Sequence, residues 1–206
     1  DVFLLGFTGF DYQDPNSDPG TYLALGEGYQ SVGFVTSFGP LLAPYVDQST
    51  REYTYHLAGL TVTSRGFLGG YLTVGFGNGG RGRYFSDPLL GGTPGTYGTN
   101  PPNATAPPTF TDGTLELGGR MDNFVLTYNF NNNTGDFSSD MTLDEGAQLI
   151  YIPSGQRAGW SYAGIAGRPN ATVPDGYDYQ VSGECRIPDA TPTTHTTWGA
   201  VKALYH

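Results

Sequence analysis

Charged residues are scarce in this chain. Asp, Glu, Lys and Arg make up 14% of its 206 residues, whereas a typical globular protein contains about 25%. Lys202 is the only lysine. A long amphipathic helix needs a charged face, so this shortage argues against a helical protein. The formal net charge of −10 argues against nucleic acid as a partner, because little basic surface is left to neutralise phosphates.

Cysteine and long apolar runs are also scarce. Cys185 is the single cysteine, so no internal disulfide forms, and its place in an alternating strand predicts a buried position. No apolar run reaches the roughly 20 residues of a membrane-spanning helix. The chain begins at Asp1 and is rich in Thr, Asn, Gly and Tyr. We therefore expect an extracellular or cell-surface protein, in its mature form after removal of a signal peptide.

Recognisable catalytic motifs are missing as well. His56, His195 and His206 are the only histidines, and none lies at metal-ligand spacing from another histidine or the cysteine. There is no GxSxG elbow, HExxH helix or Cys–His arrangement. Most aspartates lie in predicted turns, where Asp serves backbone geometry. The sequence therefore predicts a protein that is not an enzyme.

The residues that are abundant are those of β-structure and turns: 32 Gly, 15 Tyr and 12 Phe. Runs at 29–38, 52–64 and 67–76 are typical of strands, with a turn predicted at Arg65–Gly66. Apolar and polar residues alternate over 124–152, which predicts a three-stranded antiparallel meander ending in the strand 147–152. The alternation over 177–187 predicts a further strand with one buried face.

These patterns predict an all-β fold with little or no helix, organised as an antiparallel β-sandwich of the jelly-roll or immunoglobulin-like kind. We expect a single sandwich domain over residues 13–206. Proline and glycine interrupt residues 86–109 so often that no ladder can continue there, which predicts a long irregular loop within that domain.

The first strand, residues 1–12, is unusual because it is apolar on both faces. Phe3, Leu5 and Phe7 share one parity, and Phe10 lies on the other. Such a strand needs cover on both sides. It is either the central strand of its own domain or a strand donated into a groove of a neighbouring subunit. We favour donation, with Phe3, Leu5, Phe7 and Phe10 as anchors.

Donation of a strand to the next copy propagates into a fibre. The leading functional hypothesis is therefore a secreted structural protein that polymerises with itself into an extracellular filament, sheath or surface layer. The alternative is a secreted carbohydrate-binding, lectin-like or adhesin module, with tyrosines and tryptophans that stack on sugar rings. A sugar platform of this kind requires Trp160 or Trp198 to be exposed.

Two further patterns concern ions and glycans. Asp11, Asp14, Asn16 and Asp18 place oxygen ligands close together, as Ca²⁺ prefers. Their spacing is not that of an EF-hand loop, and an Asx/Pro turn is the favoured interpretation. Calcium is the only cofactor that the sequence suggests. Three sequons in predicted loops make glycosylation sites of Asn103, Asn132 and Asn170.

Overall fold

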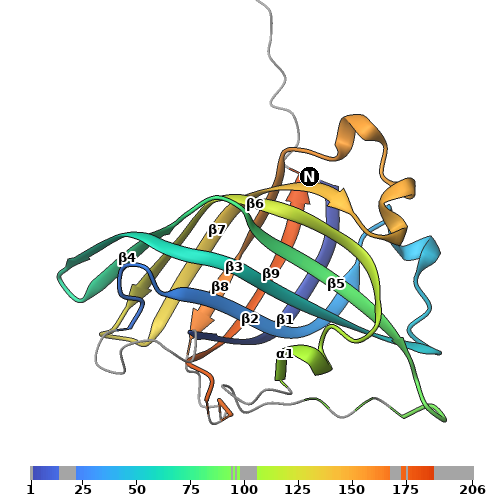
Figure 1. The fold of residues 1–206 in the computed structure, drawn as a ribbon, viewed down its shortest axis with the longest axis horizontal. Coiled ribbons are helices and arrows are strands. Elements are labelled where there is room, and N and C mark those ends of the chain that lie inside the picture. The colour runs from blue at the N-terminus through green and yellow to red at the C-terminus, as the bar shows by residue number, and fades with distance from the viewer. Residues whose placement is uncertain are drawn as a thin grey trace, which may run out of the picture.

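The fold consists almost entirely of antiparallel strands (Figure 1). The computed structural model describes residues 2–13, 22–93, 95, 97, 106–167, 173–174 and 176–187. Its strands are β1 (Val2–Gln13), β2 (Gly28–Phe38), β3 (Arg51–Leu68), β4 (Tyr71–Phe76), β5 (Gly80–Pro88), β6 (Thr114–Asn129), β7 (Thr134–Glu145), β8 (Trp160–Gly167) and β9 (Tyr179–Ile187). The helices described are the short 3₁₀ turns η1 (Ala43–Tyr45), η2 (Ala147–Tyr151) and η3 (Ser154–Gln156), and α1 (Ala106–Thr109).

The strands form one sheet that closes on itself. Neighbouring strands follow the order β2-β1-β9-β8-β7-β6-β4-β3-β5, and additional pairings join β2 to β3 and β6 to β5. The prediction of an all-β antiparallel fold with little helix is confirmed. The prediction of a jelly-roll or immunoglobulin-like sandwich is wrong, because the described strands form a closed barrel and not two packed sheets. The barrel closes where β1, the first strand, pairs with β9.

β4 and β5 lie end to end between β3 and β6. Together they occupy one strand position in the barrel wall. β5 pairs with residues 51–58 of β3, and β4 pairs with residues 62–68 of the same strand. On the other side, β5 and β4 pair with residues 114–121 and 125–129 of β6. The wall therefore has eight strand positions, and the β3–β4 hairpin projects at the left end of the molecule in Figure 1.

Inward-facing side chains fill the barrel, and many of them are aromatic. The ring of Phe7 stacks on Tyr162 with centroids 4.7 Å apart, and Phe124 stacks on Phe137 at 5.9 Å. Cys185, which the sequence places in the core, is 1% exposed. Period-2 alternation directs one side of every strand to this common interior, which is why one closed sheet needs no second layer.

β1 is covered on both faces by its own chain. Leu4 and Phe7 belong to the barrel core. On the opposite face, Tyr12 packs in a second buried cluster with Phe110 and Tyr177. β1 also pairs with β2 along one edge and with β9 along the other. In this structure it is a central strand of its own barrel, which is the first of the two placements that the sequence left open, and neither edge is free for donation to a neighbour.

The β3–β4 hairpin turns later than predicted. Arg65 and Gly66 lie within β3, which continues to Leu68. The turn is made by Gly69 and Gly70, whose φ angles are 60° and 86°. Two consecutive residues with positive φ are what a two-residue type I′ hairpin requires, and glycine adopts them without strain. The longer hairpin carries Leu68 beyond the barrel.

The third strand predicted for the meander is also different. β6 and β7 confirm its first two strands. The segment at 147–152 instead forms η2, after Gly146 turns the chain with a φ of 104°. The edge of β7 pairs with β8, over residues 134–141 and 160–167.

The segment predicted as a long loop at 86–109 is partly regular. β5 continues to Pro88, Leu90 and Thr93 form an isolated bridge, and α1 precedes Phe110. Residues 94, 96 and 98–105 lie outside the described residues.

Candidate functional site

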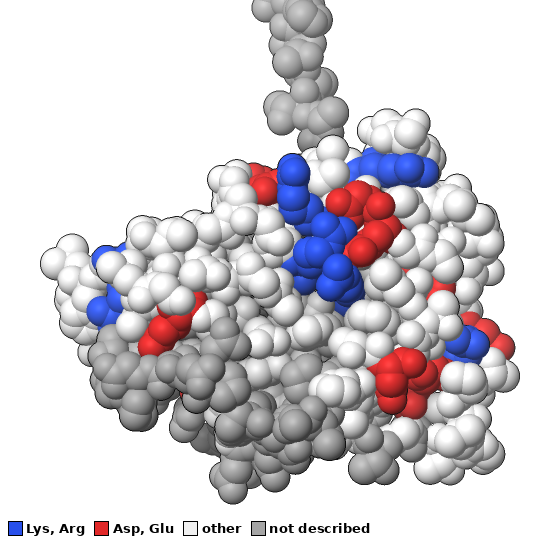
Figure 2. All heavy atoms as spheres, in the orientation of Figure 1, with Lys and Arg blue, Asp and Glu red and all other residues white. Residues whose placement is uncertain are grey.

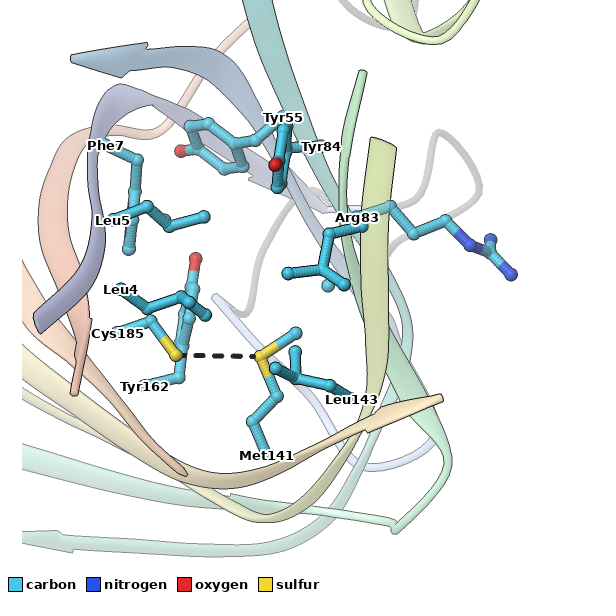
Figure 3. Close-up of a pocket in the computed structure, with 12 residues that line it drawn as sticks. Leu4, Leu5, Phe7, Tyr55, Arg83, Tyr84, Met141, Leu143, Tyr162 and Cys185 are labelled. Carbon is cyan, nitrogen blue, oxygen red and sulfur yellow. Dashed lines mark hydrogen bonds between the residues drawn. The ribbon is translucent and has the colours of Figure 1, made fainter. Parts of the chain in front are cut away.

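The barrel interior contains a small cavity near the ends of β1 and β9 (Figure 3). Its volume is about 30 Å³, and Leu4, Leu143 and Tyr162 face it while the charged end of Arg83 points away. The thiol of Cys185 approaches Sδ of Met141 at 4.0 Å across it. Ligand sites usually enclose about 300–1,000 Å³. This cavity is far below that range, which leaves the outer surface of the barrel for a ligand site.

Asp11 lies inside the barrel with no exposed surface. Its carboxylate oxygens accept hydrogen bonds from the Tyr29 hydroxyl at 3.0 Å and from the backbone N–H of Tyr179 at 2.7 Å. Burial, and then the charge of Asp178, raises the pKa of Asp11 to about 8. Its predicted partners in a calcium site, Asp14, Asn16 and Asp18, lie outside the described residues, so that site stays a prediction.

The four predicted assembly anchors all have contacts within the chain. Phe7 belongs to the core, and Leu5 is partly buried against it. Phe10 packs against the outer cluster that covers β1. The guanidinium carbon of Arg186 lies 5.1 Å from the ring centroid of Phe3, within cation–π distance.

The tryptophan platform expected of a lectin does not form at Trp160. This residue has no exposed surface, and its indole N–H donates to the Gln156 carbonyl at 2.7 Å. Trp198 lies outside the described residues. Any aromatic stacking on a sugar ring in the described part of the chain therefore has to come from tyrosine or phenylalanine.

One of the three sequons lies in the described structure. Asn132 is exposed in the turn between β6 and β7. Its side-chain oxygen accepts hydrogen bonds from the backbone N–H and the hydroxyl of Thr134, at 3.2 and 2.7 Å. Asn103 and Asn170 lie outside the described residues. An exposed turn position suits a modified asparagine.

Basic and acidic groups meet on the face shown in Figure 2. The Nε atoms of Arg81 and Arg83 both lie 2.7 Å from a carboxylate oxygen of Glu145. Arg81 also pairs with Asp144. These two arginines, the one tight basic pair in the sequence, are thus neutralised within the chain.

Three acidic residues gather near the start of β3. Glu52, Asp87 and Asp112 line a depression of about 450 Å³. Burial and the charges of Asp112 and Glu52 raise the pKa of Asp87. Across the described residues, no group of three or more His, Cys, Asp or Glu side chains is arranged to hold a metal ion.

The projecting β3–β4 hairpin exposes large apolar side chains. Phe67 and Leu68 are 60% and 85% exposed, and the ring of Phe130 lies 6.1 Å from that of Phe67. We call Phe67, Leu68 and Phe130 the tip. Arg65 is exposed on the same hairpin and is the only charged residue within residues 62–76. This surface is not predicted by a turn at Arg65–Gly66, although the Gly69–Gly70 pair is itself a hairpin signal.

A second exposed apolar surface lies around η1 and η2. Ile150 is 75% exposed, and the rings of Tyr45 and Tyr151 stack with centroids 3.5 Å apart while both remain about half exposed. We call Tyr45, Ile150 and Tyr151 the tail. Figure 1 shows the orange η2 coil and the light-blue η1 segment at the right of the molecule, opposite the β3–β4 hairpin. The tip and the tail therefore lie at opposite ends of the long axis.

A groove of about 710 Å³ crosses the outer wall of the barrel beside the β6–β7 turn. Tyr71 of β4 lines one side, and Asp136, Ile165, Gln180 and Ser182 come from β7, β8 and β9. Its volume lies within the range of small-molecule sites. None of the described residues that line it is Lys or Arg.

Comparison of the chain with protein-family models, with curated proteins and with solved structures found no match. The described part of the structure includes no helix long and apolar enough to cross a membrane. The described strands form a closed antiparallel barrel with a filled interior. The tip, the tail and the groove are its candidate functional surfaces.

Proposed function

We propose that the protein is an extracellular structural subunit that polymerises end to end, tip to tail. The observation that carries this proposal is the exposure of large apolar side chains at both ends of the long axis. Soluble monomers rarely leave contiguous apolar patches uncovered, and such patches commonly mark association surfaces.

The two surfaces differ in their charged neighbours. Arg65 is exposed on the hairpin that carries the tip, whereas the carboxylate of Asp47 follows Tyr45 of the tail by two residues and the guanidinium of Arg157 donates to the Leu149 and Ile152 carbonyls beside the tail. Hydrogen bonds from Ser49 and Thr50 lower the pKa of Asp47, so it is ionised at neutral pH. A contact between two different patches on identical subunits is heterologous, and repetition of such a contact gives an open fibre.

Assembly through contacts between subunits is retained from the sequence-based hypothesis. The contact itself is now made by the tip and the tail and not by a donated β1. Donation of β1 would require the barrel to open along two ladders, because β1 pairs with both β2 and β9. The tip and the tail are exposed without any rearrangement. The second candidate function, a carbohydrate-binding module, is favoured by the groove.

The test uses one charge substitution at each end. Leu68→Asp removes the tip contact and Ile150→Asp removes the tail contact, and both residues are more than 70% exposed, so the fold is retained. We expect wild-type protein to form elongated particles in sedimentation velocity and negative-stain images. Each variant alone should remain monomeric, whereas a 1:1 mixture should stop at dimers.

The single variants and their mixture distinguish a tip-to-tail contact from contacts between two identical ends. A tip-to-tip contact predicts that Ile150→Asp still dimerises by itself. Ile165→Asp, on the side wall with 64% exposure, is the matched control and should assemble like the wild type. A monomeric wild-type protein at high concentration, or fibres from either single variant, would show the proposal to be wrong.

A further inference from the structure

We propose that the groove on the outer wall is a binding site for a neutral oligosaccharide. This inference rests on the second candidate function, whose ligand it specifies, and it does not depend on end-to-end assembly because the groove is separate from the tip and the tail.

The groove has the length of a short chain of sugars. Strand register places residues from β4, β6, β7, β8 and β9 in one row across the wall, each the ladder partner of the next: Tyr71, Asn129, Thr134, Gly167 and Gln180. Neighbouring strands lie about 4.8 Å apart, so four steps span about 19 Å. That length exceeds a single sugar ring and fits an oligosaccharide lying across the strands.

A second row runs beside the first and supplies polar groups. Thr127, Asp136, Ile165 and Ser182 are successive ladder partners, two residues along the strands from the first row. Within the described part of the chain, the side chains of Asp136, Gln180 and Ser182 have no hydrogen-bond partner. A carboxylate accepts, while an amide and a hydroxyl both donate and accept. Sugar hydroxyls offer both functions at close spacing and can pair with all three.

The apolar part of the lining matches the C–H faces of sugar rings. Tyr71 is 50% exposed and Ile165 is 64% exposed, and both line the groove. Aromatic rings provide a flat, weakly negative face for packing against polarised C–H groups. Gly167 has no side chain, so the middle of the first row stays open between Tyr71 and Gln180.

The charge of the lining selects against anions. The described lining residues include Asp136 but neither Lys nor Arg. A phosphate or sulfate would lose its hydration without gaining a cationic partner and would be repelled by the carboxylate. Neutral sugars avoid both costs, which is why we favour them over acidic polysaccharide or nucleotide ligands.

The experiment is a titration of ¹⁵N-labelled protein with four tetrasaccharides followed by amide chemical shifts. Three probes are neutral, namely cellotetraose, maltotetraose and fully N-acetylated chitotetraose, and tetragalacturonate is the anionic comparison. We expect at least one neutral probe to move amides of residues 134–136, 165–167 and 180–182, and tetragalacturonate to leave them unchanged.

Tyr71→Ala should weaken binding of that probe by about tenfold, because it removes an aromatic contact of the groove. Tyr151→Ala removes a half-exposed tyrosine at the tail and is the matched control, with unchanged affinity expected. The proposal is overturned if no neutral probe moves the groove amides at millimolar concentration, if tetragalacturonate binds as well, or if Tyr71→Ala binds normally. A glycan attached to Asn132 and seated in the groove of the native protein would also overturn it, since the site would then be occupied from within.

Discussion

Two walls of the barrel face the same core, but the outward-facing side chains of one wall are buried and those of the other are exposed. On the β1–β2 wall, the outward-facing Tyr12 and Val32 are only 3% and 0% exposed. On the β7–β8 wall, Ile165 is 64% exposed and the neighbouring Asp136 is exposed too. The chain covers the first wall with its own residues, while the second carries the groove.

The cover over β1 and β2 comes from distant parts of the sequence. Phe110, just after α1, and Tyr177, just before β9, pack on Tyr12 and Val32. The hydroxyl of Thr54 on β3 donates to the Phe110 carbonyl at 2.8 Å and holds this segment against the wall. A strand that is apolar on both faces therefore does not by itself indicate a partner molecule.

The largest loss of stability is expected at Phe7, which lies on the covered wall and packs in the core. Phe7 is 3% exposed and its ring contacts Tyr55 and Tyr162. We expect Phe7→Ala to lower the free energy of unfolding by about 3–5 kcal/mol, since it leaves a cavity in a packed interior. Urea unfolding monitored by circular dichroism measures the change.

Phe10→Ala is the counterpart on the outer face of the same strand. Phe10 is only partly buried against the second cluster, so its loss should cost about 1–2 kcal/mol. Equal losses at the two positions would mean that the outer cluster is as well packed as the core and that β1 has no preferred face.

Local alternation was sufficient to predict individual strands. Phe137, Met141 and Leu143 occupy alternate positions in the predicted meander and are all buried, and β9 lies within the predicted 177–187 segment. The closure of the barrel was not predictable in this way. It depends on pairs such as Leu5 with Cys185, which are far apart in the sequence and have no local signature.

The candidate surfaces were harder to predict than the strands. The tip was missed because Gly66 resembled a turn residue, whereas Gly69 and Gly70 carry the positive φ angles. The groove could not be foreseen, because its residues meet only through the register of five strands. Asp11, one of the four predicted calcium ligands, lies within β1 and faces the interior, which alternation alone did not indicate.

Asp11, on the inner face of the covered wall, should make the stability of the protein depend on pH. Its pKa is about 8 in the folded protein against 3.8 for the ordinary carboxyl. The folded state therefore holds the proton more tightly, and the resulting stability is complete below pH 3.8 and is lost as pH rises to about 8. Between pH 5 and pH 7, the wild type should lose about 2–3 kcal/mol relative to Asp11→Asn, which has no proton to release. Unfolding in urea at both pH values measures this difference.

Asp47→Asn is the matched control. Hydrogen bonds from Ser49 and Thr50 lower the pKa of this exposed carboxyl, so its contribution is present above the ordinary pKa and is lost only as pH falls further. Its stability relative to the wild type should therefore be the same at pH 5 and pH 7. A parallel pH dependence in wild type and Asp11→Asn would show that Asp11 is ionised in the folded barrel.

The smallest changes in stability are expected for substitutions on the outer faces of the two walls. Thr54 is 1% exposed, and Thr54→Val keeps the shape of the side chain but leaves the Phe110 carbonyl without its hydroxyl partner. We expect a loss of about 1 kcal/mol, the usual contribution of one such hydrogen bond. Ile165→Thr, on the uncovered wall, should change stability by less than about 0.5 kcal/mol. Both substitutions replace one β-branched residue by another, so differences in intrinsic strand preference largely cancel. Equal losses of stability in urea unfolding would mean that the segment over β1 contributes nothing to the fold.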